Sequence, residues 1–254
     1  MTPTAPIPLT STGIACFFAM GTRVELHRFG PGNEDALMLA QRAIEAVDDA
    51  LTIHRPSAAT ALNEALLAGR EVAVDDPVLF DALIEIDAVA RRVAVTRPVA
   101  LDFGGFGKGF ALDRAAAALR AAGVSSALLS AGESSIAVVG EHPLGGGWPF
   151  AIPDPLRPDR ELVEVELTDE ALSISSTVGA GTLAPDRAAT IRPGDASVVS
   201  AARCAVVIDR SGSRAEMLST ALIVAADDEV ARLTGGARRF LFDLATVESA
   251  RMCV

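Results

Sequence analysis

Hydrophobic residues alternate with polar ones along several short stretches of the chain, and this period of two predicts β-strands. The clearest stretch is 161–167, where leucines and valines alternate with charged residues. Other strand-like runs lie at 14–28, 127–130, 135–139, 148–152 and 197–208, and the segment from Arg239 to the end is expected to form a pair of short strands. The proline-rich stretch 153–158 is predicted to be a loop.

Helical spacing of hydrophobic residues is found in fewer places. Asn33 is expected to cap a helix whose apolar residues recur at positions 37, 40, 44 and 47. Asp76 and Pro77 form a typical start for a second helix. Two further helices are predicted at 111–122, where Gly123 follows the last turn, and at 213–226.

Strand-like runs outnumber the helices, and the helices do not alternate regularly with them. This order predicts an α+β fold with mainly antiparallel sheets packed against helices, rather than a doubly wound parallel sheet. No internal repeat or low-complexity linker divides the chain. Residues 1–254 are therefore expected to form one domain, which could contain subdomains.

Composition narrows the function classes. Of the 254 residues, 50% are apolar and 22% charged, which suits a large buried core and excludes a disordered chain. The net charge of −11 argues against nucleic acid as a partner, because phosphate contacts need clustered basic side chains. No stretch is long and apolar enough to span a bilayer, and no basic segment opens a signal peptide. We expect a cytoplasmic protein, or a periplasmic one if a leader has been removed.

One basic residue stands out from this composition. Lys108 is the single lysine beside 21 arginines, and it lies in a run with four glycines at positions 104, 105, 107 and 109. Glycines let backbone groups approach a ligand closely, and the positive end of the helix that follows suits a phosphate. The run matches neither the GxxxxGK[ST] nor the GxGxxG pattern, so a plain tight turn is an equally good interpretation of these residues alone.

A longer comparison of motifs favours a ligand site. The segment 102–113 (DFGGFGKGFALD), followed by AGV at 122–124 and SAGE at 130–133, resembles the core of the FAD:protein FMN transferase family, also called ApbE. Further similar segments follow the family's order along nearly the whole chain. They are AMGT at 19–22, Arg55-Pro56 with Asn63, Trp148 to Ile152 with Asp154-Pro155, Ser175-Ser176 at a turn, and AEMLSTAL at 215–222.

The resemblance implies a specific reaction. Members of this family bind FAD and Mg²⁺, cleave the pyrophosphate of the flavin, and transfer FMN to a Thr or Ser of a target flavoprotein with release of AMP. It implies that the Gly105 carbonyl, Glu216 and Thr220 would bind the metal. The residues expected around the flavin and its phosphates are Met20, His54, Asp102, Lys108, Gly132, Glu133 and Ile191.

Several residues depart from the family pattern. The segment 189–193 (Ala-Thr-Ile-Arg-Pro) replaces the HxxDP motif, so that Ala189 stands for the histidine and Arg192 for the aspartate. In an active enzyme, Arg192 or Asp195 would take over catalytic roles. Alternatively, the chain is a catalytically degenerate relative that binds a flavin nucleotide without transferring it. A third hypothesis is a scaffold protein in which the glycine run is only a turn.

Glu216 has two interpretations as well. It stands where the family has an aspartate, and its side chain is one methylene longer. Ser213 and Glu216 also have the spacing of a capping box, in which the glutamate would close the N-terminus of its own helix.

Overall fold

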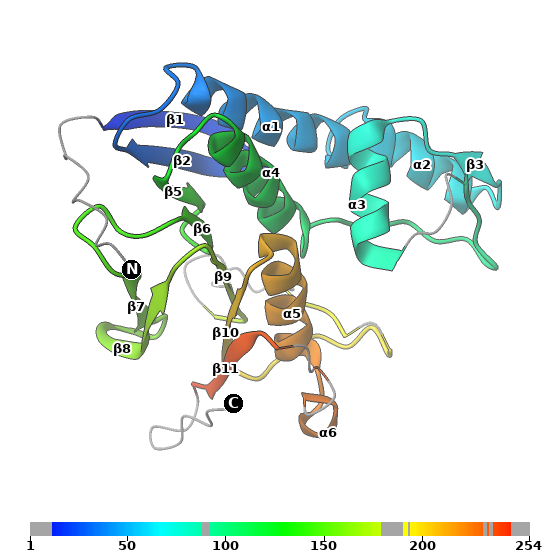
Figure 1. The fold of residues 1–254 in the computed structure, drawn as a ribbon. Coiled ribbons are helices and arrows are strands. Elements are labelled where there is room, and N and C mark those ends of the chain that lie inside the picture. Colours follow the sequence, from blue (N-terminus) through cyan, green and yellow to red (C-terminus); the bar gives the residue numbers. More distant parts are fainter. Residues whose placement is uncertain are drawn as a thin grey trace.

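A computed structural model describes residues 12–87, 92–178, 190–192, 194–230, 233 and 236–244. Its main element is a seven-stranded sheet in the order β1-β2-β5-β6-β9-β10-β11, in which every neighbouring pair is antiparallel (Figure 1). The strands are β1 (Gly13–Ala19), β2 (Thr22–Phe29), β5 (Ser126–Ala131), β6 (Ser135–Val139), β9 (Ala171–Ser176), β10 (Arg203–Asp209) and β11 (Arg238–Asp243). Two further pairs of strands are β3 (Val72–Ala73) with β4 (Arg92–Val93), and β7 (Trp148–Asp154) with β8 (Arg157–Leu167).

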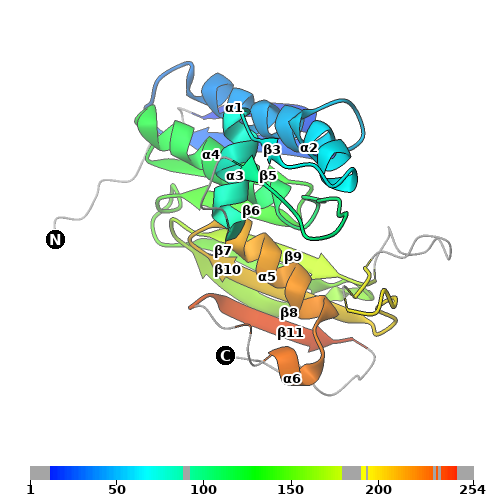
Figure 2. The same ribbon diagram turned by 90° about the vertical axis from the view of Figure 1, so that its right-hand side faces the viewer.

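The helices lie on one face of the sheet and the β7–β8 hairpin lies on the other (Figure 2). They are α1 (Ala36–Leu51), α2 (Ala58–Leu67), α3 (Pro77–Asp87), α4 (Gly107–Ala121), α5 (Gly212–Val224) and α6 (Asp227–Val230). Strand β10 shows why both faces are covered. Its Ala205 and Val207 pack with α5, whereas Val206 and Ile208 pack with the hairpin, since successive side chains of a strand point to opposite faces.

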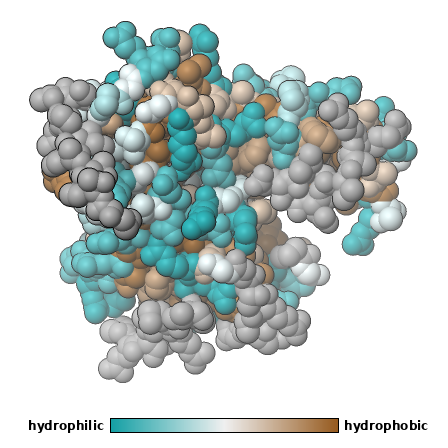
Figure 3. All heavy atoms as spheres, in the orientation of Figure 1, coloured by the Kyte–Doolittle hydropathy of each residue, from teal (hydrophilic) through white to brown (hydrophobic). Residues whose placement is uncertain are grey.

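The α+β class with mainly antiparallel sheet is thus confirmed. The predicted start of α3 is also confirmed, because Asp76 Oδ1 accepts a hydrogen bond from the Leu79 backbone N–H at 2.8 Å. In α1 the N-cap is Asp35 rather than Asn33, whose side chain accepts a bond from the Asp35 N–H instead. None of the described helices could cross a membrane, since each is too short or too polar. In Figure 3, hydrophilic side chains cover much of the middle of the visible face.

Other boundaries were predicted wrongly. The expected loop at 153–158 is mostly strand, because β7 continues to Asp154 and β8 begins at Arg157. Pro153 is tolerated there since the register shifts on both sides of it, which is where a missing N–H is least costly. Strand β10 begins only at Arg203, and the expected turn at Ser175-Ser176 is the end of β9. Near the C-terminus one strand, β11, is described, and residues after 244 lie outside the described part of the chain.

The connection between β7 and β8 is closed by a buried carboxylate. The side chain of Asp154 is 2% exposed and accepts bonds from Arg157 Nε at 2.8 Å and from the Leu156 N–H at 2.9 Å. Burial opposes ionisation, but these donors and the charge of Arg157 hold the pKa of Asp154 below its ordinary value. The ionised carboxylate therefore stabilises the fold above the unfolded-state pKa of about 3.9, and this contribution is lost as the pH falls through the lower folded-state value.

We expect Asp154→Asn to lower the free energy of unfolding by about 1–2 kcal/mol at pH 7, because bonds to a charged acceptor are lost. The difference from wild type should shrink below about pH 4 as Asp154 becomes protonated. Urea unfolding at a series of pH values measures both effects. A difference that stayed constant into the acid range would show that the charge of Asp154 does not contribute.

Candidate active site

The N-terminal ends of α4 and α5 meet beside the sheet, and two glycines make the contact. A Cβ placed on Gly109 would lie 2.1 Å from the backbone oxygen of Gly212, which no side chain could tolerate. Asp113 from α4 joins the two helices by accepting bonds from the Gly212 N–H at 2.7 Å and the Ser213 N–H at 3.0 Å. Burial raises the pKa of Asp113, although these bonds oppose the shift.

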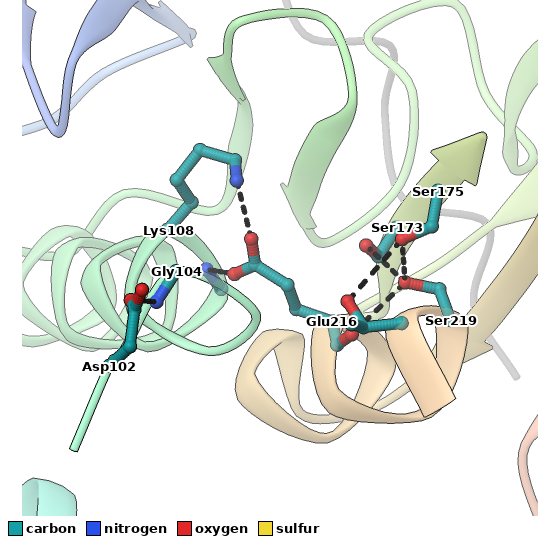
Figure 4. Close-up of polar contacts among 9 residues, drawn as sticks. Asp102, Gly104, Lys108, Ser173, Ser175, Glu216 and Ser219 are labelled. Atoms are coloured by element: carbon teal, nitrogen blue, oxygen red, sulfur yellow. Dashed lines mark hydrogen bonds and ion pairs between the residues drawn. The ribbon is translucent and has the colours of Figure 1, made fainter. Parts of the chain in front are cut away.

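The single lysine and Glu216 form an ion pair at this junction (Figure 4). Lys108 Nζ donates to Glu216 Oε1 at 2.5 Å, and the Gly109 N–H donates to Glu216 Oε2 at 2.5 Å. The Glu216 side chain is 4% exposed and that of Lys108 is 24% exposed. The capping-box interpretation is wrong, because the N-cap of α5 is Ser211 and the Glu216 carboxylate instead contacts the first turn of α4.

Helix α4 begins at Gly107, four residues earlier than predicted, so Lys108 and Gly109 belong to its first turn rather than to a loop. Glycine has a low helix propensity, which hid this start in the sequence pattern. The contact with α5 and the carboxylate of Glu216 supply the stabilisation that glycine lacks. Helix packing therefore sets where the lysine points.

A group of hydroxyls lies beside Glu216, between β9 and α5 (Figure 4). The Ser219 Oγ is 3.0 Å from Ser173 Oγ and 2.8 Å from Ser175 Oγ, and it donates to the Glu216 backbone oxygen at 3.0 Å. Thr220 Oγ1 is 3.5 Å from Ser175 Oγ. Thr220 also faces Gly105, since a Cβ on that glycine would lie 3.1 Å from its hydroxyl oxygen.

Two tight turns stand next to this junction. Met20 and Gly21 connect β1 to β2 with φ values of 54° and 69°, and Gly132 and Glu133 connect β5 to β6 with φ values of 64° and 61°. Because β2 pairs with β5, the two turns lie at the same end of these strands. A Cβ on Gly132 would clash with Thr22. Met20 reaches α4, where its Cε would lie 2.7 Å from a Cβ on Gly107.

A cavity of about 310 Å³ opens beside Met20. His54 and Asp102 also line it, and Asp102 Oδ1 accepts the Gly104 N–H at 2.7 Å, which fixes the loop before α4. His54 is exposed. The structure therefore places Met20, His54 and Asp102 around one cavity, with Lys108 in the adjoining helix.

Arg192 and Asp195 lie at the other end of α5. Arg192 Nε donates to the Val224 backbone oxygen at 3.2 Å, and both residues line a separate cavity of about 540 Å³. Eight residues of helix between Glu216 and Val224 correspond to about 12 Å. Ile191 is 53% exposed and pairs with Val198. Ala189 and Pro193 lie outside the described residues.

The sequence profile of the ApbE family matches residues 81–239, more than half of the chain, and this range includes the glycine run, α4 and α5. The chain belongs to the ApbE family. Comparison with curated proteins finds no match. The ApbE fold itself extends beyond the matched residues, as the following structures show.

Three solved structures are similar over most of their length. The Pseudomonas stutzeri flavinyl transferase ApbE is 21% identical, with a TM-score of 0.72 and coverage of 91% of each chain. The Vibrio cholerae flavin transferase ApbE is 16% identical, with a TM-score of 0.73 and coverage of 91% of this chain and 92% of that one. The ApbE protein of Thermotoga maritima is 17% identical, with a TM-score of 0.69 and coverage of 91% and 94%. At these identities the likeness establishes the ApbE fold.

The expected magnesium ligands are brought close together, but they do not fit a divalent cation in this arrangement. Gly105 and Thr220 face each other, whereas both oxygens of Glu216 are engaged by Lys108 and the Gly109 N–H. Mg²⁺ needs hard oxygen ligands with negative charge to offset its own. Within the described part of the chain, no three His, Cys, Asp or Glu side chains are grouped to hold a metal ion.

Two residues of this ApbE site stand in the motifs of the sequence but were assigned no role there. Asp113 is the last residue of the segment 102–113. Its position one helical turn after Gly109 was the signal that could have placed it on the same helix face. Asn63 holds the start of the glycine run, because its side-chain amide bonds the Leu101 N–H at 2.7 Å and the Leu101 carbonyl at 2.8 Å. Its role depends on a contact across 38 residues of sequence, which no local pattern reveals.

Proposed function

We propose that this chain is a flavin transferase that binds FAD in the cavity beside Met20 and Asp102 and transfers FMN to a hydroxyl of a target flavoprotein. The observation that carries the proposal is Lys108, the single lysine of the chain, which is held in the N-terminal turn of α4, while Asp102 to Gly104 just before that helix line the cavity. An ammonium group has three donors, so Lys108 can bond Glu216 and still donate to a phosphate. The positive end of α4 adds to the attraction.

The transfer would exchange one phosphorus–oxygen bond for another. The acceptor hydroxyl oxygen attacks the phosphorus on the FMN side of the pyrophosphate, the bond to AMP breaks, and the hydroxyl proton passes to a base. Lys108 would stabilise the negative charge of the pyrophosphate as this bond breaks. In the Met20-Gly21 turn, Gly21 has no side chain and open space around its Cα, which favours close approach of a ligand to the backbone.

The test is incubation with FAD and a fragment of a target flavoprotein. Transfer is supported by AMP release together with a covalent FMN adduct in the mass spectrum. Absence of any flavin uptake, measured by absorbance and calorimetry, would contradict the proposal. The assay is run with and without Mg²⁺, because the Glu216 carboxylate is already engaged.

A second candidate is binding of a flavin nucleotide without transfer. It is favoured by the replaced motif at 189–193 and by Arg192, which bonds the C-terminal end of α5 rather than the junction of α4 and α5. In the same assay this candidate predicts bound, intact FAD and no AMP.

Replacing Lys108 by methionine is expected to weaken FAD binding at least about tenfold, because a charged hydrogen bond to phosphate is lost. Calorimetric titration measures the change. The replacement also leaves the Glu216 carboxylate without the ammonium of Lys108. The double variant Lys108→Met/Glu216→Gln removes both charges, so that an effect of the lost ammonium on FAD binding can be told from an effect of an unpaired carboxylate on folding. Arg120→Met, which breaks the surface pair with Asp169, is the matched control and should leave FAD affinity unchanged. Unchanged affinity in the lysine variants would mean that Lys108 does not contact the phosphates.

A further inference from the structure

The carboxylate of Glu216 is directed at α4 with both oxygens engaged. One oxygen accepts from the ammonium of Lys108 and the other from the Gly109 N–H, each at 2.5 Å, and the side chain is almost fully buried. Figure 4 shows the carboxylate on the side of Lys108, with the hydroxyls of Ser173, Ser175 and Ser219 on the opposite side of the Glu216 backbone. At this junction the Glu216 carboxylate is therefore bonded to an ammonium group and a backbone N–H, while the second carboxylate, Asp113, is engaged by the first turn of α5.

These partners oppose a cation. The lysine neutralises the charge of the carboxylate, and the N-terminal turn of α4 adds a partial positive charge beside it. The remaining oxygens, the Thr220 hydroxyl and the Gly105 carbonyl, are uncharged. A divalent ion placed among them would face an ammonium group at short range without a free anionic ligand, which is unfavourable in a partly buried site.

We infer that the Lys108–Glu216 ion pair takes the place of a divalent cation in this chain, and that the length of the Glu216 side chain determines this. The inference deepens the proposed function, since it concerns the metal requirement of the same site. The positive charge that this site offers to a phosphate then comes from Lys108 and from the N-terminus of α4.

Side-chain length is the decisive variable. An aspartate at position 216 would withdraw the carboxylate by about 1.5 Å, one carbon–carbon bond, and could not reach Lys108 and the Gly109 N–H together. Its oxygens would then lie closer to the surface of α5, where residue 220 occupies the same face one turn later. An acidic oxygen would then lie nearer to the Thr220 hydroxyl, which faces Gly105.

The test measures Mn²⁺ alone, by the loss of the free-ion electron paramagnetic resonance signal, so that it does not depend on flavin binding. The proteins are the wild type, Glu216→Asp, Glu216→Gln, Lys108→Met and the control Arg120→Met. We expect no Mn²⁺ binding at this site in the wild type and control. Both Glu216→Asp and Lys108→Met should bind Mn²⁺ at least about tenfold more tightly, which is the range in which neighbouring groups tune metal sites.

Two results would overturn the inference. One is stoichiometric Mn²⁺ binding by the wild type that Glu216→Gln removes. The other is a failure of both folded variants to gain affinity over the control. Circular dichroism establishes that each variant is folded, and Lys108→Met provides the answer if Glu216→Asp does not fold. If the Mn²⁺ affinities are as expected but the wild type does not bind FAD, the proposed function is refuted and the inference about the ion pair stands.

Discussion

Replacing Gly109 by alanine is expected to lower the free energy of unfolding by about 3 kcal/mol, near the upper end of overpacking effects. The added Cβ would lie 2.1 Å from the Gly212 oxygen, 2.4 Å from the Gly212 carbonyl carbon and 2.8 Å from the Ser213 nitrogen. All three are backbone atoms, so the strain cannot be relieved by turning a side chain. Helices α4 and α5 would have to separate, which would also stretch the bond from the Gly109 N–H to Glu216.

Thermal unfolding measures this effect, with an expected fall in Tm of roughly 6–12 °C for a chain of this size. Gly107→Ala is the matched control, because it lies in the same helical turn and gains the same helix propensity. Its Cβ would meet only the terminal Cε of Met20, which can rotate away. A similar loss of stability in both variants would mean that the glycine contact between α4 and α5 is not the cause.

The second large effect is expected for Asp113→Ala, which should lower the free energy of unfolding by about 2–4 kcal/mol. This carboxylate accepts the N–H groups of Gly212 and Ser213 and also the Ser211 hydroxyl at 3.1 Å. Removing it leaves the first turn of α5 without its acceptor in a buried position. Glu216 lies one turn further along α5, so the ion pair with Lys108 should be displaced as well.

Urea unfolding measures the loss of stability, and Asp113→Asn tests its origin. Asparagine keeps one acceptor oxygen, so it should recover part of the stability but not all of it. Asp195→Ala is the control, because this exposed carboxylate also accepts a backbone N–H, from Ser197, but joins no second helix. Equal stability of wild type and Asp113→Ala would show that α5 is held by its other contacts.

The local patterns were sufficient for much of the fold. Period-two alternation predicted the strand that became β8, and the Asp76-Pro77 pair predicted the start of α3. Where glycine or proline interrupted a pattern, prediction was less accurate. Gly107 and Gly109 concealed the first turn of α4, and Pro153 concealed the end of β7. In both places contacts with other elements outweigh the low intrinsic propensity of the residue.

The sequence by itself determined the antiparallel α+β class, the ApbE resemblance and the unusual position of Lys108. Only the tertiary structure decided what Glu216 does, because its carboxylate meets Lys108 across 108 residues of sequence. From spacing alone, Glu216 could have capped its own helix or bound a metal with Thr220. Local spacing determines which residues share a helix face, whereas the close approach of Gly109 to Gly212 determines which partner that face meets.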